Sequence, residues 1–279
     1  MNPIVKVNCL KHFYPDKTEV HLCGLEFLVN PGERVVILGP NGAGKTTLIS
    51  HILGLLKAVD GEVEVLGMDP YKNFEKVRKY IGVVFQNVDE QIIGPTVYDD
   101  IAFTMRNDKV DKNEIDKRVR EIAALLKIED ILNKIPHYLS GGQKKKVALA
   151  GAIANKPKIL VMDEPFNSLD VSSKSDILFL LNKINKEFGI TLIITTHDLD
   201  IVPEIADKIY LISDGKIISG EGPRELFSNV GIFEDVGLEP PILSKLFHSL
   251  REEGINVKIP VNIKEAKEQL LSVINYKKV

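Results

Sequence analysis

One glycine-rich run restricts the fold more than any other part of this sequence. Residues 39–46 fit the pattern GxxxxGK[ST], with an apolar run at 35–38 before them and an apolar-periodic stretch at 47–53 after them. A strand, a glycine turn and a helix in this order predict a phosphate-binding loop within an α/β sheet, because successive N–H groups and a helix start can face phosphate oxygens. The residues expected to bind the phosphates are Gly39, Pro40, Asn41, Gly42, Ala43, Gly44, Lys45, Thr46 and Thr47.

Two side chains of this loop carry distinct expectations. Lys45 is expected to bridge the β- and γ-phosphates of a nucleotide, and the Thr46 hydroxyl is expected to bind Mg²⁺, a hard ion that prefers oxygen ligands. The implied ligands are therefore ATP and Mg²⁺. An accidental glycine turn is the alternative, and the flanking strand and helix patterns argue against it.

Three further apolar runs, at 81–85, 159–162 and 190–196, also end in polar residues. Ligands of parallel sheets bind beyond the carboxyl ends of the strands, so these endings are expected to meet at the phosphate loop. The residues concerned are Gln86, Asp163, Glu164 and His197.

Each of these residues has a chemical role and a structural alternative. Asp163 and Gln86 can serve Mg²⁺ through oxygen, while Glu164 can accept a proton from the attacking water. His197 can bind the γ-phosphate or hold that water, which makes Glu164 and His197 the expected catalytic pair. Taken singly, Gln86 would be an ordinary loop residue, His197 a satisfied structural histidine and the acidic pair a solvated strand end.

A second glycine cluster precedes an alanine- and leucine-bearing helical stretch at 144–154. It is expected to form another anion site at a helix start, and its residues are Ser140, Gly141, Gly142 and Gln143. One nucleotide has a single γ-phosphate, so one chain has one anion site more than its own nucleotide needs. A second subunit explains the additional site, because each chain would close over the ATP of the other. The three lysines at 144–146 are expected to be solvated helix residues and not a nucleic-acid patch.

Composition limits the remaining function classes. The 279 residues carry 36 Lys and Arg against 39 Asp and Glu, and this net charge of −3 gives no global attraction to nucleic acid. The apolar runs are too short to cross a bilayer, and the start of the chain lacks a signal-peptide pattern, so a cytoplasmic location is expected. Cys9 and Cys23 lie fourteen positions apart without a metal-binding pattern, and both are expected to be free, buried thiols.

The chain has no internal repeat, and the positions of its glycine- and proline-containing segments suggest one large domain and one small one. A charged, helical stretch between Asn107 and Pro136 indicates an insertion in the sheet domain. A glycine-rich segment at 220–223 suggests a boundary. We expect an ATPase domain at 1–222, with a helical subdomain at about 87–157, and a small extension at 223–279.

Five motifs in order make residues 4–222 resemble an ATP-binding cassette (ABC) ATPase. They are the phosphate loop, Gln86, LSGGQ at 139–143, ILVMDE at 159–164 and His197 within TTHD. The resemblance implies a P-loop NTPase with a RecA-like core, an antiparallel β subdomain and a helical subdomain. It also implies that Tyr14 stacks on adenine, with a core tyrosine as the alternative, and that 168–170 links two active sites.

Within that family, segments 84–92 and 99–103 look like those of the energy-coupling-factor and cobalt/nickel importer ATPases. Segment 236–241 is similar to a short C-terminal extension that, by resemblance, helps to hold the dimer. Three positions depart from the subgroup's usual residues: Val88, Phe166 and Val171.

The resemblance implies the ATP-hydrolysing motor of an importer, peripheral on the cytoplasmic face of the cell membrane. Its partners would be integral membrane subunits and a second ATPase subunit, either another copy or a paralogue, and no nucleic acid. The segment from Gln86 to Phe103 would lie near the groove that receives a membrane partner's cytoplasmic helix. The cargo would be a metal ion, cobalt or nickel, or a vitamin. A soluble ABC ATPase of DNA repair or translation is the alternative, and a binding module without turnover is a third.

Overall fold

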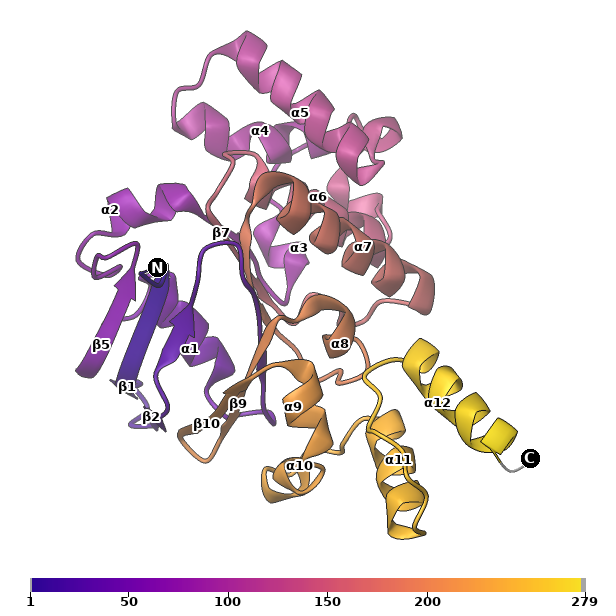
Figure 1. The fold of residues 1–279 in the computed structure, drawn as a ribbon. Helices are drawn as coiled ribbons and strands as arrows, with labels where there is room; N and C mark the ends of the chain where they lie inside the picture. Colours follow the sequence, from indigo (N-terminus) through magenta and orange to yellow (C-terminus); the bar gives the residue numbers. More distant parts are fainter. Residues whose placement is uncertain (1, 277–279) are drawn as a thin grey trace.

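A ten-stranded, curled sheet organises the chain in the computed structural model, which describes residues 2–276 (Figure 1). The strand order is β3-β1-β2-β10-β9-β4-β8-β7-β6, with β5 paired to β1. The strands are β1 (Val5–Phe13), β2 (Glu19–Gly24), β3 (Phe27–Val29), β4 (Arg34–Leu38), β5 (Asp60–Val65), β6 (Ile81–Val84), β7 (Ile159–Asp163), β8 (Thr191–Thr195), β9 (Lys208–Ser213) and β10 (Lys216–Glu221).

The sheet has a parallel part and an antiparallel part. Strands β6, β7, β8, β4 and β9 are parallel neighbours, whereas β2, β3 and β5 all pair antiparallel with β1. Every residue of β7 and β8 is buried, as expected of apolar strands covered on both faces. The expected fold class, an α/β P-loop core with an antiparallel β portion, is confirmed.

Helices cover the parallel strands and continue beyond them on one side. Their bounds are α1 (Lys45–Ile52), α2 (Phe74–Val77), α3 (Val88–Gln91), α4 (Val97–Asn107), α5 (Lys112–Leu126), α6 (Gly141–Ile153), α7 (Val171–Phe188), α8 (Val202–Ile205), α9 (Pro223–Ser228), α10 (Gly231–Asp235), α11 (Ile242–Glu252) and α12 (Ile263–Tyr276). Short 3₁₀ turns lie at Arg78–Tyr80, Glu129–Ile131 and Pro136–Tyr138. Among the described residues, no helix combines the length and apolar character needed to cross a bilayer.

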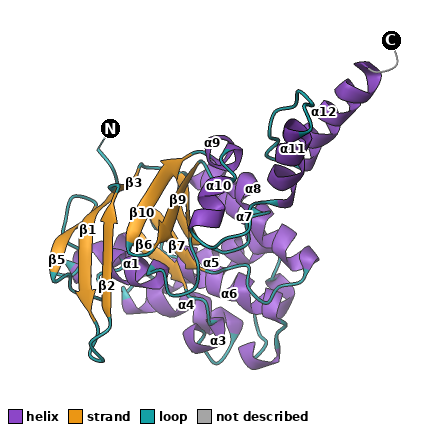
Figure 2. Ribbon diagram, turned by 90° about the horizontal axis from the view of Figure 1, so that it is seen from below, coloured by secondary structure: helices purple, strands orange, loops and turns teal. Residues whose placement is uncertain are grey.

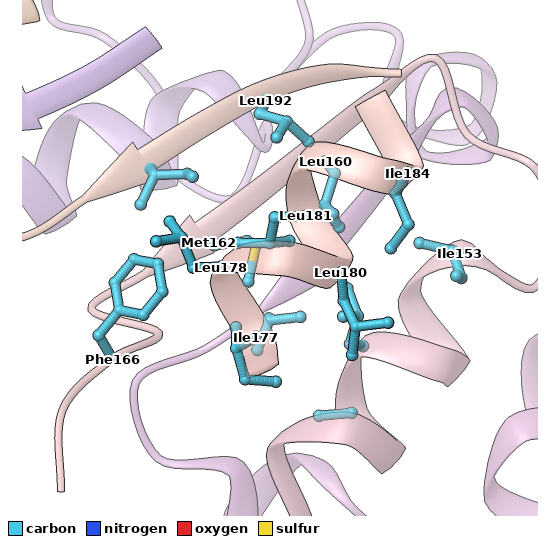
Figure 3. Close-up of a cluster of buried hydrophobic side chains, with 14 of the residues drawn as sticks. Ile153, Leu160, Met162, Phe166, Ile177, Leu178, Leu180, Leu181, Ile184 and Leu192 are labelled. Atoms are coloured by element: carbon cyan, nitrogen blue, oxygen red, sulfur yellow. The ribbon is translucent and has the colours of Figure 1, made fainter. Parts of the chain in front are cut away.

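Strand alternation divides the core into two apolar layers. On β7, Leu160 and Met162 face the layer of α6 and α7, while Ile159 and Val161 face the layer of α1 and the antiparallel strands. Figure 3 shows the first layer, with side chains of α7 packed against the sheet. Phe166, one of the positions that departs from the subgroup, is buried in this layer. The parallel strands are thereby fixed from both sides, and their carboxyl ends are held in register.

The C-terminal helices fall into two groups. Residues of α9 and α10, including Phe227 and Phe233, belong to the main apolar layer. Helices α11 and α12 project from the rest of the molecule (Figure 2) and share a small separate core around Phe247 and Ile259. Residues 277–279 of the expected extension, and Met1 of the expected ATPase domain, lie outside the described residues.

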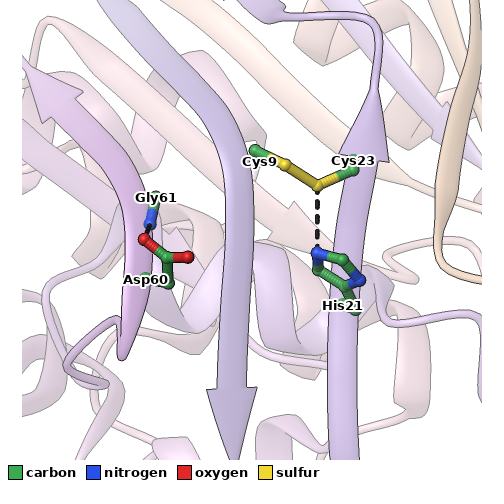
Figure 4. Close-up of a disulfide and its surroundings, with 5 residues drawn as sticks. All are labelled: Cys9, His21, Cys23, Asp60 and Gly61. Carbon is green, nitrogen blue, oxygen red and sulfur yellow. Dashed lines mark hydrogen bonds between the residues drawn. A yellow bond between two sulfur atoms is a disulfide. The ribbon is translucent and has the colours of Figure 1, made fainter.

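The expectation for the two cysteines is wrong. Cys9 and Cys23 form a disulfide between β1 and β2, and neither residue is buried (Figure 4). In the antiparallel pairing Leu10 lies opposite Leu22, so the next position outward brings 9 against 23. The separation of fourteen residues along the chain hid this proximity, because a hairpin register is not visible in spacing alone.

Candidate functional site

The phosphate loop connects β4 to α1 through backbone conformations that favour glycine. Gly42 and Gly44 have φ angles of 82° and 98°, and Gly44 is the N-cap residue of α1. Gly39 has another reason: a Cβ there would collide with the carbonyl oxygen of Ile212 on β9. The conformation of the loop therefore depends on glycine at three positions, and α1 begins directly after the loop.

Lys45 is held inside this loop. Its Nζ donates to the carbonyl oxygens of Gly39 (2.7 Å) and Pro40 (3.1 Å), and only 7% of the residue is exposed. Burial lowers the pKa of Lys45, and the carboxylates of Glu164 and Asp163 partly oppose that change. Nζ lies 3.9 Å from Oε1 of Glu164, so the ammonium of Lys45 and the carboxylate of Glu164 lie next to each other at the phosphate loop.

Thr46 and Asp163 bring oxygen ligands together across the sheet. The Thr46 hydroxyl donates to Oδ2 of Asp163 at 3.1 Å, and the Thr195 hydroxyl donates to the other carboxylate oxygen, Oδ1. Because Thr195 is fully buried at the end of β8, it fixes the Asp163 carboxylate toward the loop. A hydroxyl beside a carboxylate is the kind of oxygen donor set that suits Mg²⁺, so these residues fit the ion that the sequence implies.

Glu164 and His197 form a second contact at the strand ends. Nδ1 of His197 donates to Oε2 of Glu164 at 3.0 Å, since a carboxylate can only accept. Glu164 has a φ of 46°, and its N–H donates to the Thr195 hydroxyl at 2.9 Å, which turns the residue out of β7 toward the site. Glu164 is 6% exposed, whereas about half of the His197 side chain is open to solvent.

Gln86 enters this arrangement through its backbone. Its side chain is exposed just after β6, and its carbonyl oxygen accepts from Nζ of Lys145 on α6 at 3.0 Å. Lys145 is 6% exposed, and burial lowers its pKa against the opposing attraction of Asp163 and Glu164. The contact links the loop after β6 to α6.

Tyr14 also reaches the phosphate loop. Its hydroxyl and that of Thr47, in the first turn of α1, are 2.9 Å apart, and its ring packs edge-on against His12. Tyr14 is only partly buried. Contact of this ring with a bound base stays a prediction.

The second glycine cluster lies elsewhere, at the start of α6. Ser140 caps this helix: its hydroxyl accepts from the N–H of Gln143, whose side chain accepts from the N–H of Ser140. Gly141 is exposed with open space around its Cα. Ser140 and Gly141 are exposed, whereas a Cβ at Gly142 would meet Ser173 of α7. Helix α6, which begins at this cluster, stands apart from α1 in Figure 1.

Two residues at the site were missed by the sequence reasoning. Thr195 could have been found, because a hydroxyl ending the strand next to β7 must lie beside the acidic pair in a parallel sheet. Lys145 carries no such signal. The expectation that it is solvated like its two neighbouring lysines is wrong, because α6 packs it against the loop after β6.

Comparison with known proteins agrees with this geometry. A family model described as "ABC transporter" matches residues 22–167. The chain belongs to this ABC transporter family, and it is an ATPase of that class. It is 43% identical to the energy-coupling factor transporter ATP-binding protein EcfA of Methanocaldococcus jannaschii, with 99% of this chain and 98% of that one aligned.

Two solved structures share the fold. One is CbiO1 of Clostridium perfringens, described as part of the ABC transporter complex CbiONQ: the TM-score is 0.77 at 38% identity, over 89% of this chain and 100% of that one. The other is a dimeric ATP-binding cassette in a post-hydrolysis state with ADP and Pi, with a TM-score of 0.70 at 30% identity, over 78% of this chain and 98% of that one. The predicted resemblance to ABC ATP-binding subunits is thus confirmed.

Proposed function

We propose that this chain is the ATP-hydrolysing subunit of an importer of the energy-coupling-factor type, whose membrane subunits are separate proteins. The observation that carries the proposal is the position of Glu164, whose carboxylate lies between Lys45 and His197 at the mouth of the phosphate loop. The relatives named as energy-coupling-factor ATP-binding proteins support the importer class.

The chemistry assigned to each residue follows from these contacts. The loop amides of 39–46 and Lys45 bind the phosphates, and Mg²⁺, when bound, supplies positive charge that stabilises the transferring phosphoryl group. Thr46, Asp163 and the Gln86 amide would hold that ion, with Thr195 orienting Asp163. Glu164 accepts the proton of the attacking water, and His197 orients its carboxylate.

A second subunit completes the site in this proposal. Ser140 and the exposed Gly141 present a helix start outward, where it can close over the γ-phosphate held by a partner ATPase. That partner is a second copy or a paralogue. Binding of ATP then favours the closed dimer and hydrolysis reopens it, which converts chemistry into movement. The described part of the extension at 223–279 offers exposed apolar side chains of α11 and α12, such as Leu246 and Leu271, that suit a role in dimerisation.

A groove between β6, α4 and α6 is the surface that we propose for the membrane partner. Its apolar lining includes Ile81, Ile93, Phe103 and Ala152, and its polar lining includes Arg78, Asp100 and Asp108. Ile93 is 62% exposed and Phe103 is 44% exposed, so an amphipathic helix from a membrane subunit could bury both. The subunit would then be peripheral on the cytoplasmic face of the membrane, with cobalt, nickel or a vitamin as cargo and no nucleic acid as partner.

The test is to purify the chain from its native membrane in mild detergent and identify its companions. An integral membrane protein supports the importer, whereas ribosomes or DNA would select a soluble ABC ATPase. The double variant Ile93→Glu/Phe103→Ser should lose the membrane partner and keep ATP binding. Phe179→Ser, a change at an exposed phenylalanine of α7, is the matched control and should retain both.

A further inference from the structure

Three potential metal ligands meet on the outer face of the antiparallel strands, away from the Mg²⁺ ligands described above. Cys9 lies on β1, and His21 and Cys23 lie on β2 (Figure 4). The two sulfur atoms and one imidazole nitrogen all lie within 4.8 Å of one another. Nε2 of His21 is 3.0 Å from Sγ of Cys23.

The sheet itself fixes this cluster. His21 and Cys23 are two positions apart on one strand, so they face the same side, and the pairing of Leu10 with Leu22 sets Cys9 against Cys23. A bulge in the pairing of β1 with β5 occurs at this level, and Cys9 has a φ of 46°. The three backbone positions follow from the register of the hairpin and do not require the disulfide bond.

We propose that the reduced cluster is a binding site for a thiophilic divalent cation of the Zn²⁺ type. Two cysteine thiolates and one neutral imidazole are the ligands that such an ion prefers, and water would supply the fourth position. A disulfide alone has no need of an imidazole against one of its sulfurs, and His21 therefore indicates a third ligand. The exposure of Cys9 and His21 gives an ion direct access from solvent.

The two states are exclusive and balance chemically. A small-molecule dithiol that reduces the disulfide gives two electrons and two protons, and itself becomes a cyclic disulfide. Binding of one Zn²⁺ to the two thiols then releases two protons to solvent. The disulfide is thus the oxidised, metal-free form of the site.

Neighbouring groups leave the site open and separate it from the Mg²⁺ ligands. Lys11, opposite His21, is neutralised by an ion pair with Glu19 at 2.7 Å. The side chains of Val20 and Leu22 lie on the other side of β2, against Gly44 of the phosphate loop. A Cβ added to Gly44 would be 3.1 Å from each of them. The soft ligands on the outer face and the hard oxygens of Thr46 and Asp163 therefore select different ions.

The test titrates the reduced, metal-free chain of 279 residues with Zn²⁺ against a chromophoric chelator, with Mg²⁺ in excess to occupy oxygen sites. One tightly held Zn²⁺ per chain is expected, and Co²⁺ in its place should give a thiolate-to-metal absorption band. The same protein oxidised to the disulfide should take up none. His21→Gln should weaken binding by about tenfold or more, since changes even to residues behind metal ligands cost that much.

His137→Gln, at another exposed histidine, is the matched control and should bind Zn²⁺ as the wild type does. The double variant Cys9→Ser/Cys23→Ser should bind no Zn²⁺ at this stoichiometry. Equal uptake by the oxidised and reduced wild type, or by the reduced wild type and the double variant, would overturn the site. Full affinity in His21→Gln would overturn the three-ligand assignment.

Discussion

Nδ1 of His197 lies 3.0 Å from Oε2 of Glu164, although the two residues are 33 positions apart in the sequence. The βαβ unit β7-α7-β8 connects them, and the parallel pairing of β7 with β8 places the two residues side by side at the carboxyl ends of these strands. The contact orients the buried carboxylate of Glu164, and the bond from its N–H to Thr195 fixes the backbone that carries it.

Glu164→Gln should abolish most turnover while leaving nucleotide binding intact. An amide cannot accept the water's proton, so steady-state ATPase should fall by about 10²- to 10⁴-fold. The variant should also accumulate as an ATP-bound dimer, visible by size-exclusion chromatography. Glu253→Gln, at an exposed site after α11, serves as the control. Near-normal hydrolysis in Glu164→Gln would remove Glu164 from its assigned role.

Thr195→Val should impair the site through Asp163 and Glu164. Valine fills the same volume but leaves an oxygen of Asp163 and the N–H of Glu164 without their partner, at a cost of about 1–3 kcal/mol. We expect a lower unfolding temperature and a higher Mg²⁺ requirement for hydrolysis.

The other end of β8 supplies the matched control. Thr191 is equally buried, and its hydroxyl accepts from the N–H of Gly32 at 2.9 Å. Thr191→Val should therefore also destabilise the protein, by less because one hydrogen bond is lost and not two, and should leave the Mg²⁺ requirement unchanged. If both variants shift the Mg²⁺ dependence equally, the effect of Thr195 is structural and not directed at Asp163.

The sequence predicts the strands and the residues at their ends well, because these depend on local patterns. An uninterrupted apolar run such as 159–162, followed by Asp163, indicates a buried parallel strand wherever it occurs. The glycines at 42 and 44 likewise report backbone angles that the loop needs.

Contacts that depend on register or on helix packing are not available from such patterns. The pairing of Cys9 with Cys23 follows from which residue of β1 faces which residue of β2, and a turn of unknown length hides it. The burial of Lys145 can be predicted only once the packing of α6 against the carbonyl oxygen of Gln86 is known. Its neighbour Lys144, on the same helix, instead forms an ion pair with Asp89 near the surface.

Lys145→Met should slow hydrolysis without removing ATP binding. Lys145 acts as a positioning residue, holding the carbonyl of Gln86, so its loss should free the loop that carries a proposed Mg²⁺ ligand. Changes behind metal ligands typically cost about 10- to 100-fold in metal affinity or activity. Lys144→Met is the neighbouring control. The readout is the Mg²⁺ concentration for half-maximal ATPase, which a merely structural role would leave unmoved.

Asp207→Asn should destabilise the sheet in a pH-dependent way. Asp207 accepts from the Arg34 side chain at 2.6 Å and from its backbone N–H at 2.9 Å, which ties the start of β4 to the start of β9. Burial raises the pKa of Asp207, but these hydrogen bonds outweigh it and the pKa is lowered. Because the Asp207 side chain is 42% exposed, we expect a loss of only about 1 kcal/mol near pH 7.

A lowered folded pKa fixes the direction of the pH effect. The stabilisation is complete above the unfolded pKa of Asp207 and disappears as the pH falls through its folded value. Chemical denaturation at several pH values should therefore show wild type and Asp207→Asn converging in acid. Asp130→Asn, at an exposed turn, should track the wild type throughout. A gap that persists below the folded pKa would contradict the ion-pair explanation.

Lys45→Met should separate ligand binding from folding. Without nucleotide, the Lys45 residue is 7% exposed and burial lowers its pKa, so the loss of its charge should partly offset the loss of its hydrogen bonds and cost the folded state little. Added ATP should no longer stabilise the variant, whereas at a hundred times its Kd it should stabilise wild type by about 2.7 kcal/mol.

The pH dependence gives the same lysine a second signature. The pKa of Lys45 is lower in the folded chain than in the unfolded chain. As the pH rises through this range, the folded chain releases the proton first and the unfolded chain still holds it, so wild-type stability increases relative to Lys45→Met. Thermal denaturation from neutral pH into alkali, without nucleotide, should show the stability of the variant falling relative to that of wild type. Lys134→Met, at an exposed lysine, should keep the full response to ATP. If Lys45→Met keeps that response as well, the phosphates are bound without this ammonium and the loop must act through its backbone amides alone.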